Sequence, residues 1–93
     1  MYMAMEHPEF DLVLEMLCCF GSRPVTRAEL ARDLDLPSGR QVLPVMHEAE
    51  RRFGIKFTLT EVTNEHVGRY TVARESEIKA RELCHQYWTA VYG

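Results

Sequence analysis

Residues 36–54, LPSGRQVLPVMHEAERRFG, decide how the rest of the chain is interpreted. Read as a helix, this stretch has two unlike faces. Apolar residues recur at spacings of four, three and four and so share one stripe: Val42, Met46, Ala49 and Phe53. The same spacings place a basic set on the opposite side: Arg40, Pro44, His47 and Arg51. The stretch predicts a helix that buries one face and presents the other to a partner such as a DNA groove, or simply to solvent.

The start of this helix has two interpretations. The sequence SGRQ (residues 38–41) matches a capping box, which would begin the helix at Gly39. Pro44 would then fall in the second turn, where it removes a hydrogen bond and costs about 3 kcal/mol or kinks the helix. Either the helix bends at Pro44, or residues 38–43 form a separate tight turn and the regular helix begins near Pro44.

The composition is that of a globular protein. The chain has 93 residues, of which 46% are hydrophobic and 27% charged, which predicts a single domain over residues 1–93. No apolar run approaches membrane-spanning length, and the N-terminus lacks the basic segment of a signal peptide. The odd number of cysteines, with Cys18 and Cys19 adjacent, argues against a disulfide framework. We therefore expect a cytoplasmic protein without a membrane segment.

The charge is unevenly distributed. The formal net charge is −3, which is unusual for a nucleic-acid binder because such proteins usually carry a basic surplus. Residues 1–20 hold four acidic and no basic side chains, whereas residues 21–74 hold nine basic and seven acidic ones. The middle of the chain is therefore mildly basic, which permits phosphate binding without requiring it.

Helices and a short strand are expected before the central helix. Residues 1–8 form an arm, and a first helix follows over residues 9–20, with Pro8 at its start and Gly21 after its end. Val25 is expected to add a short strand to a later hairpin. The sequence TRAE (residues 26–29) matches a capping box, so the second helix begins at Arg27 and ends near residues 35–37.

A hairpin and a last helix are expected after the central helix, which Gly54 closes. Residues 55–60 alternate apolar and polar side chains, and residues 67–74 form a second strand with Tyr70 and Val72 facing inward. Residues 63–66 form the turn between them. Ser76 is the predicted N-cap of a C-terminal helix over residues 77–92.

The first helix has more apolar surface than one small core needs. One stripe includes Val13 and Leu17, and a second includes Leu12 and Met16. A three-helix core would bury only the first stripe, so the second requires either the C-terminal helix or another subunit. We favour a homodimer in which the first and last helices pack across subunits. The residues expected at that interface are Leu12, Met16, Cys19, Leu83, Tyr87, Trp88 and Val91.

The order of elements is that of a winged-helix domain. The sequence VLEMLCCFGSRPVTRAELARDLDLP (residues 13–37), followed by the central helix, resembles the helix-turn-helix of DeoR-type, WYL-type and biotin-repressor regulators. GRYTV (residues 68–72) looks like the second wing strand of those domains, and the wing is also similar to that of IscR-type regulators, whose cluster-ligand cysteines are absent here. The resemblance covers residues 12–74, and Pro37 and Pro44 depart from it. It implies an α+β winged helix with a core over residues 9–74 and a C-terminal helix over residues 75–93.

The resemblance implies that the chain is a transcriptional regulator that binds double-stranded DNA. The central helix would enter the major groove, where Arg40 suits guanine and Gln41 suits adenine. Other polar residues of the helices and the hairpin would contact phosphate or the minor groove. The full set is Arg23, Arg27, Ser38, Arg40, Gln41, His47, Arg51, Lys56, His66 and Arg69. The alternative is that these are solvated surface charges.

Other functions find little support in the sequence. The cysteines lie in apolar helix patterns and have no zinc-type spacing, so no metal site or cofactor is expected. No nucleophile elbow or glycine-rich phosphate loop is present, so we expect no enzyme. The second hypothesis is a protein–protein interaction module on the same fold, a small inhibitor or adaptor, which the acidic balance and Pro44 favour.

Overall fold

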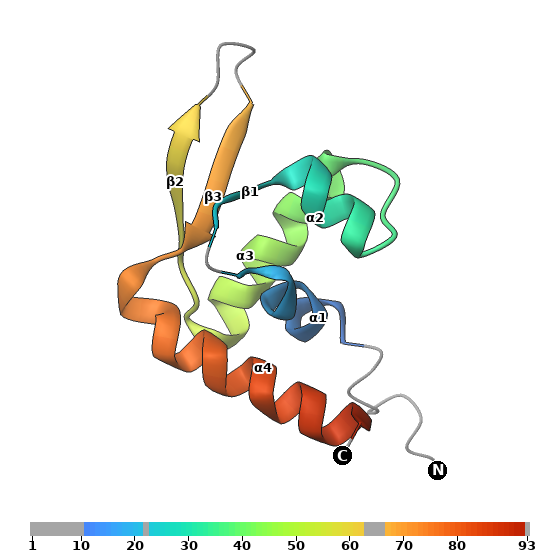
Figure 1. Cartoon of the computed structure of the whole chain (residues 1–93), viewed down its shortest axis with the longest axis vertical. Coiled ribbons are helices and arrows are strands. Elements are labelled where there is room, and N and C mark those ends of the chain that lie inside the picture. The colour runs from blue at the N-terminus through green and yellow to red at the C-terminus, as the bar shows by residue number, and fades with distance from the viewer. Residues whose placement is uncertain (1–10, 22, 63–66, 93) are drawn as a thin grey trace.

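The computed structural model describes residues 11–21, 23–62 and 67–92. In this part of the chain the fold is α+β, with four α-helices and one three-stranded antiparallel sheet (Figure 1). The elements are, in order, α1 (Leu12–Cys19), β1 (Val25–Thr26), α2 (Arg27–Asp33), the 3₁₀ helix η3 (Gly39–Gln41), α3 (Val42–Phe53), β2 (Phe57–Val62), β3 (Gly68–Val72), the 3₁₀ helix η4 (Arg74–Ser76) and α4 (Glu77–Tyr92).

The start of α2 is confirmed. The Thr26 hydroxyl accepts a hydrogen bond from the Glu29 N–H at 3.1 Å, and the Glu29 carboxylate accepts one from the Thr26 N–H at 2.8 Å. This reciprocal pair satisfies two N–H groups that the first turn leaves without a helical partner. The helix is short and ends at Asp33, before the predicted stop at residues 35–37. Asp35 then takes a left-handed conformation with φ 60°.

The start of α1 differs from the prediction. Asp11 has extended backbone angles, and its carboxylate accepts hydrogen bonds from the N–H groups of Val13 and Leu14. Asp11 is therefore the N-cap, and α1 begins at Leu12 rather than at residue 9. The predicted N-terminal arm and Pro8 lie outside the described residues.

Of the two interpretations of the central helix, the structure has the second, a separate turn followed by a regular helix that begins near Pro44, and not a helix start at Gly39. Ser38 makes no side-chain cap bond, and residues 39–41 form the separate turn η3. The regular helix α3 begins at Val42, which makes Pro44 its third residue. The N–H groups of a first helical turn have no acceptor within the helix, so a proline there breaks no hydrogen bond. The predicted end is confirmed, because Gly54 follows α3 with φ 72°.

The sheet has the strand order β1-β3-β2. Val25 of β1 lies opposite Tyr70, so the predicted short strand does join the hairpin. Phe57 lies opposite Val72, and the pairing shifts by one residue between Leu59 and Glu61 of β2. The second strand, β3, falls within the predicted residues 67–74, whereas β2 starts two residues later than predicted. The predicted turn at residues 63–66 lies outside the described residues.

The core lies between the helices and the base of the hairpin. Met16 of α1 is fully buried, and α4 lies against α1, so the C-terminal helix covers the second apolar stripe within a single chain (Figure 1). The start of α4 at Glu77 is confirmed. The Ser76 hydroxyl accepts a hydrogen bond from the Lys56 N–H at 2.9 Å, which ties α4 to the start of the hairpin. The buried hydrophobic core residues are Val13, Met16, Leu17, Leu30, Ala31, Leu34, Val42, Val45, Met46, Ala49, Ile55 and Ala80.

Candidate nucleic-acid interface

The start of α2 and the turn η3 meet at one end of the fold. A Cβ atom on Gly39 would lie only 3.2 Å from the Ala28 nitrogen and from the Arg27 Cβ. The absence of a side chain at Gly39 therefore allows the two helix starts to approach closely. This contact brings together four of the predicted DNA-binding residues, all but the first of them exposed: Arg27, Ser38, Arg40 and Gln41.

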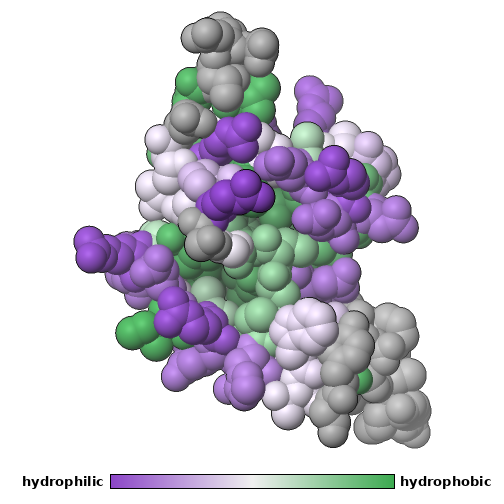
Figure 2. Space-filling model, in the orientation of Figure 1, coloured by the Kyte–Doolittle hydropathy of each residue, from purple (hydrophilic) through white to green (hydrophobic). Residues whose placement is uncertain are grey.

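This end carries basic side chains, and the exposed carboxylate of Asp35 lines a hollow beside Ser38 and Gly39. Among the described residues, no carboxylate forms an ion pair with Arg27 or Arg40. The helix α3 also points its N-terminus here, where the helix dipole contributes partial positive charge. Figure 2 shows hydrophilic residues gathered at the upper right, where α2 lies in Figure 1. We name the set Arg27, Ser38, Arg40 and Gln41 the helix-start cluster.

The outward face of α3 is less basic than the sequence pattern suggested. His47 is exposed as predicted. Arg51 is also exposed, but its Nε donates to a Glu48 carboxylate oxygen at 2.9 Å, and a second bond joins the same two side chains. The Arg51 hydrogen bonds hold the pKa of the Glu48 carboxyl below its usual range. Glu50 adds a further exposed acidic side chain, so the middle of this face has no basic surplus.

Arg52 has a structural position that the sequence analysis did not identify. Its guanidinium donates to both Asp11 carboxylate oxygens, at 3.1 and 2.9 Å, and lies 4.7 Å from the centre of the Phe53 ring. Partial burial raises the pKa of the Asp11 carboxyl, but the Arg52 hydrogen bond and the backbone N–H bonds outweigh it and hold that pKa below 3.8. This bridge joins α1 to α3 across 41 residues of sequence, a separation that local patterns do not reveal.

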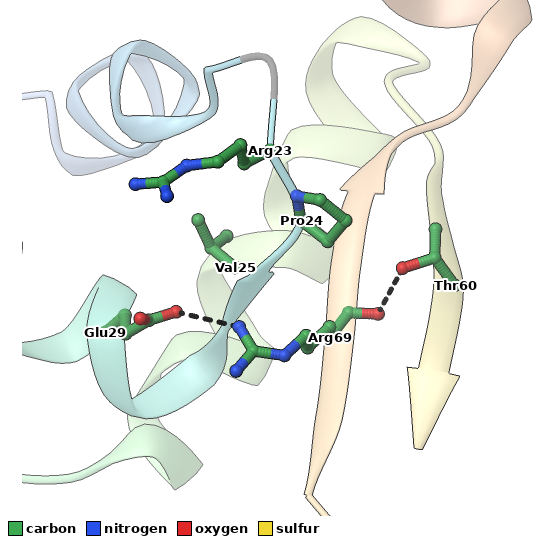
Figure 3. Close-up of a pocket in the computed structure, with 6 residues that line it drawn as sticks. All are labelled: Arg23, Pro24, Val25, Glu29, Thr60 and Arg69. Atoms are coloured by element: carbon green, nitrogen blue, oxygen red, sulfur yellow. Dashed lines mark hydrogen bonds and ion pairs between the residues drawn. The ribbon is translucent and has the colours of Figure 1, made fainter. Parts of the chain in front are cut away.

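A second basic region lies beside the hairpin. Arg23 and Arg69 line an open hollow of about 590 Å³ next to β1 and β3, together with Glu29 and Thr60 (Figure 3). The Arg69 guanidinium lies 3.7 Å from the Glu29 carboxylate, and the Thr60 hydroxyl donates to the Arg69 carbonyl oxygen at 3.3 Å. Figure 3 shows the Arg23 and Arg69 side chains on either side of Val25.

Lys56, another predicted DNA contact, lies apart from the helix-start cluster. Lys56 is exposed, but it follows the C-terminus of α3 and hydrogen-bonds through its backbone to Ser76. A helix of 12 residues is about 18 Å long, which separates Lys56 from Arg40 at the opposite end of α3. His66 lies outside the described residues.

The predicted dimer surface is largely occupied within the chain. Met16 is fully buried, Tyr87 is only 7% exposed, and the Tyr87 hydroxyl donates to the Glu15 carboxylate of α1 at 3.4 Å. Of the residues predicted at the dimer interface, Trp88 is the most accessible, with 49% of its surface exposed. The other members are partly buried: Leu12, Cys19, Leu83 and Val91.

Comparison of the chain with protein-family models, curated proteins and solved structures gave no match. The described part of the chain contains no helix long and apolar enough to cross a membrane. Within residues 11–21, 23–62 and 67–92, no three His, Cys, Asp or Glu side chains are grouped to hold a metal ion. The arrangement of the described residues is therefore the basis for assigning a function.

Proposed function

We propose that the chain is a winged-helix DNA-binding transcriptional regulator whose helix-start cluster contacts duplex DNA. The single observation that carries the proposal is the close approach of η3 to α2 at Gly39, where a Cβ atom would lie 3.2 Å from the Arg27 Cβ, with Arg40 next in sequence. Their guanidiniums have no carboxylate partner among the described residues, so phosphate binding displaces no ion pair there.

The roles within the cluster follow from side-chain chemistry. Arg40 and Gln41 precede α3 and are exposed, so they suit bidentate hydrogen bonding to guanine and adenine edges. Arg27 and Ser38 suit the phosphate backbone, which fixes the orientation of a protein on the duplex. Arg23 supplies a second backbone contact from the hairpin side, where the Arg69 guanidinium is already paired with the Glu29 carboxylate.

A salt titration tests this proposal. Binding of a labelled duplex of about 25 base pairs is measured by fluorescence anisotropy from about 50 to 200 mM salt. Three or four phosphate contacts predict that log K falls with log salt with a slope of about −3. Arg27→Ala should lower the magnitude of this slope by about one. Absence of binding at the lowest salt concentration, or binding that is independent of salt, would contradict the proposal.

A homodimer is part of the same proposal, because two copies double the number of DNA contacts. The exposed Trp88 near the end of α4 supports a small contact between subunits. Light scattering at tens of micromolar protein should then give twice the chain mass of 10.8 kDa. Trp88→Ser should return the monomer mass, whereas a monomeric wild type would exclude the dimer.

The second candidate is a protein–protein interaction module. The observation that favours it is apolar exposure on the hairpin, where Leu59 is 51% and Val62 is 55% exposed. Such side chains suit a protein surface better than a phosphate backbone. If this candidate is correct, the chain shows no salt-dependent binding to duplex DNA. A protein partner should instead bind the immobilised wild-type chain, and the Val62→Asp variant should no longer bind it. Duplex binding unchanged by Val62→Asp would exclude this candidate.

A further inference from the structure

Two cysteines that are far apart in sequence face each other across α1 and α4. The Cys18 thiol donates to the Cys84 carbonyl oxygen at 3.8 Å, across 66 residues of sequence. The neighbouring Cys84 thiol also contributes to the raised pKa of Cys18. Figure 1 shows α1 lying along α4, and these helices pack closely. The odd cysteine count argued against a disulfide framework, but it says nothing about one pair brought together by folding.

The pair is accessible to small reagents. Cys18 and Cys84 are free thiols, and both side chains are partly exposed. Burial, followed by the neighbouring Cys84 thiol, raises the pKa of Cys18 to about 12. Because the thiolate is the reactive form, Cys18 remains a thiol under mild conditions and reacts slowly.

Cys19 provides a matched comparison on the same helix. Its thiol donates to the Glu15 carbonyl oxygen at 3.4 Å, one turn back along α1. Burial, followed by the charges of Asp33 and Glu15, raises the pKa of Cys19 to about 11. The pKa of Cys19 is thus also raised, but its hydrogen bond lies within its own helix and not across to α4.

We propose that Cys18 and Cys84 form an intramolecular disulfide under oxidising conditions, which links α4 covalently to α1. With oxidised glutathione as the oxidant, one cysteine thiolate attacks the glutathione disulfide and releases one reduced glutathione. The other cysteine thiolate then attacks the protein sulfur of that mixed disulfide and releases the second glutathione. The protein loses two protons and two electrons, and the glutathione disulfide is reduced to two thiols.

The link acts mainly on the unfolded chain. It closes a loop between residues 18 and 84, and loops of this length lose much conformational entropy in the unfolded state. The oxidised protein should therefore unfold on the order of 10 °C higher than the reduced protein. The pair lies away from the helix-start cluster, so duplex affinity should be the same in both forms. The redox proposal is thus independent of the proposed function.

The test uses the full chain with oxidised glutathione, followed by intact mass and peptide mapping without reductant. The expected result is a loss of about 2 Da, a peptide pair joining Cys18 to Cys84, and the higher melting temperature, all reversed by dithiothreitol. Cys19→Ser should behave like wild type, whereas Cys84→Ser should lose both the mass change and the melting shift. Circular dichroism checks that each variant is folded.

Three results would overturn the inference. The first is a folded wild-type chain that forms no disulfide under conditions that oxidise the urea-unfolded chain. The second is a dominant link that involves Cys19. The third is oxidation only between two chains, seen as a doubled mass without reductant.

Discussion

The two ends of α3 carry arginines in opposite electrostatic settings. At the N-terminal end, Arg40 is exposed beside the start of α2, and no carboxylate among the described residues forms an ion pair with it. At the C-terminal end, Arg51 is bonded to Glu48, and Arg52 donates to both oxygens of Asp11. The same residue type is therefore presented to solvent at one end and occupied by acidic partners at the other.

This difference shows that a count of basic residues along a helix does not reveal which of them are already paired with carboxylates. A carboxylate beside a guanidinium lowers the local positive potential, and it must be displaced or tolerated when phosphate approaches. The Asp11–Arg52 bridge instead joins α1 to α3. We infer that the N-terminal end of α3 binds and that the C-terminal end positions the helix.

Gly39→Val should have the largest effect, because it breaks the close approach on which the N-terminal end depends. A Cβ at this position already lies 3.2 Å from backbone atoms of α2, so a branched side chain forces the helix starts apart. We expect a loss of about 1–3 kcal/mol in the free energy of unfolding, measured by urea denaturation. The control is Gly21→Ala, whose Cβ would meet nothing within 4 Å. Equal stability of the two variants would show that the close approach does not matter.

Asp11→Ala should have the next largest effect, because it removes both the N-cap of α1 and the bridge to Arg52. The expected loss is about 1–2 kcal/mol at neutral pH. The pKa of the Asp11 carboxyl is lowered in the folded state, so its contribution is present above the usual pKa of an aspartate and disappears as the pH falls through the lower folded pKa. Urea denaturation at neutral and acidic pH should show that the difference in the free energy of unfolding between Asp11→Ala and wild type becomes smaller in acid. A difference that widens in acid would contradict the assignment.

Glu48→Gln should sharpen the comparison by releasing Arg51. Removing the acidic partner should raise duplex affinity about two- to threefold at low salt, measured by fluorescence anisotropy. Glu50→Gln is the matched control, because it changes the net charge equally and has no ion pair with an arginine among the described residues. Equal gains in the two variants would mean that net charge, rather than release of Arg51, causes the effect.

Pro44→Ala should have the smallest effect. Pro44 is the third residue of α3, where no helical N–H bond is lost, so we expect the free energy of unfolding to change by less than about 0.5 kcal/mol. Thermal and urea denaturation measure this change. A gain near 3 kcal/mol would instead mean that the proline interrupts a longer helix beginning at Gly39.

Local signals in the sequence predicted much of the fold. The capping box at Thr26 and the stop at Gly54 are each set by a few neighbouring residues, and both were confirmed. The start of α4 at Glu77 was also confirmed, but Ser76 lies in η4 and its hydroxyl bonds to the distant Lys56 N–H. The similar sequence SGRQ at Ser38 does not form a capping box. The chain forms the 3₁₀ turn η3 there, and the Ser38 side chain makes no cap bond. A motif that fits two backbone conformations does not decide between them.

Contacts between distant residues could not be predicted in the same way. The sequence left open whether α4 or another subunit covers Met16, and only the folded chain shows that α4 does. The Asp11–Arg52 and Cys18–Cys84 contacts join residues 41 and 66 positions apart. The candidate site was predicted to combine residues of the second helix, the central helix and the hairpin, but the sequence did not reveal that Arg51 is bonded to Glu48.

The most direct test of the account compares Arg40→Ala with Arg51→Ala on the same duplex at the same low salt concentration. Each variant removes one guanidinium from an exposed position associated with α3, so their net charges are equal. We expect Arg40→Ala to weaken binding at least about tenfold, as for a lost bidentate or phosphate contact, and Arg51→Ala to change it less than about twofold. Equal losses in the two variants, or a larger loss in Arg51→Ala, would contradict the account.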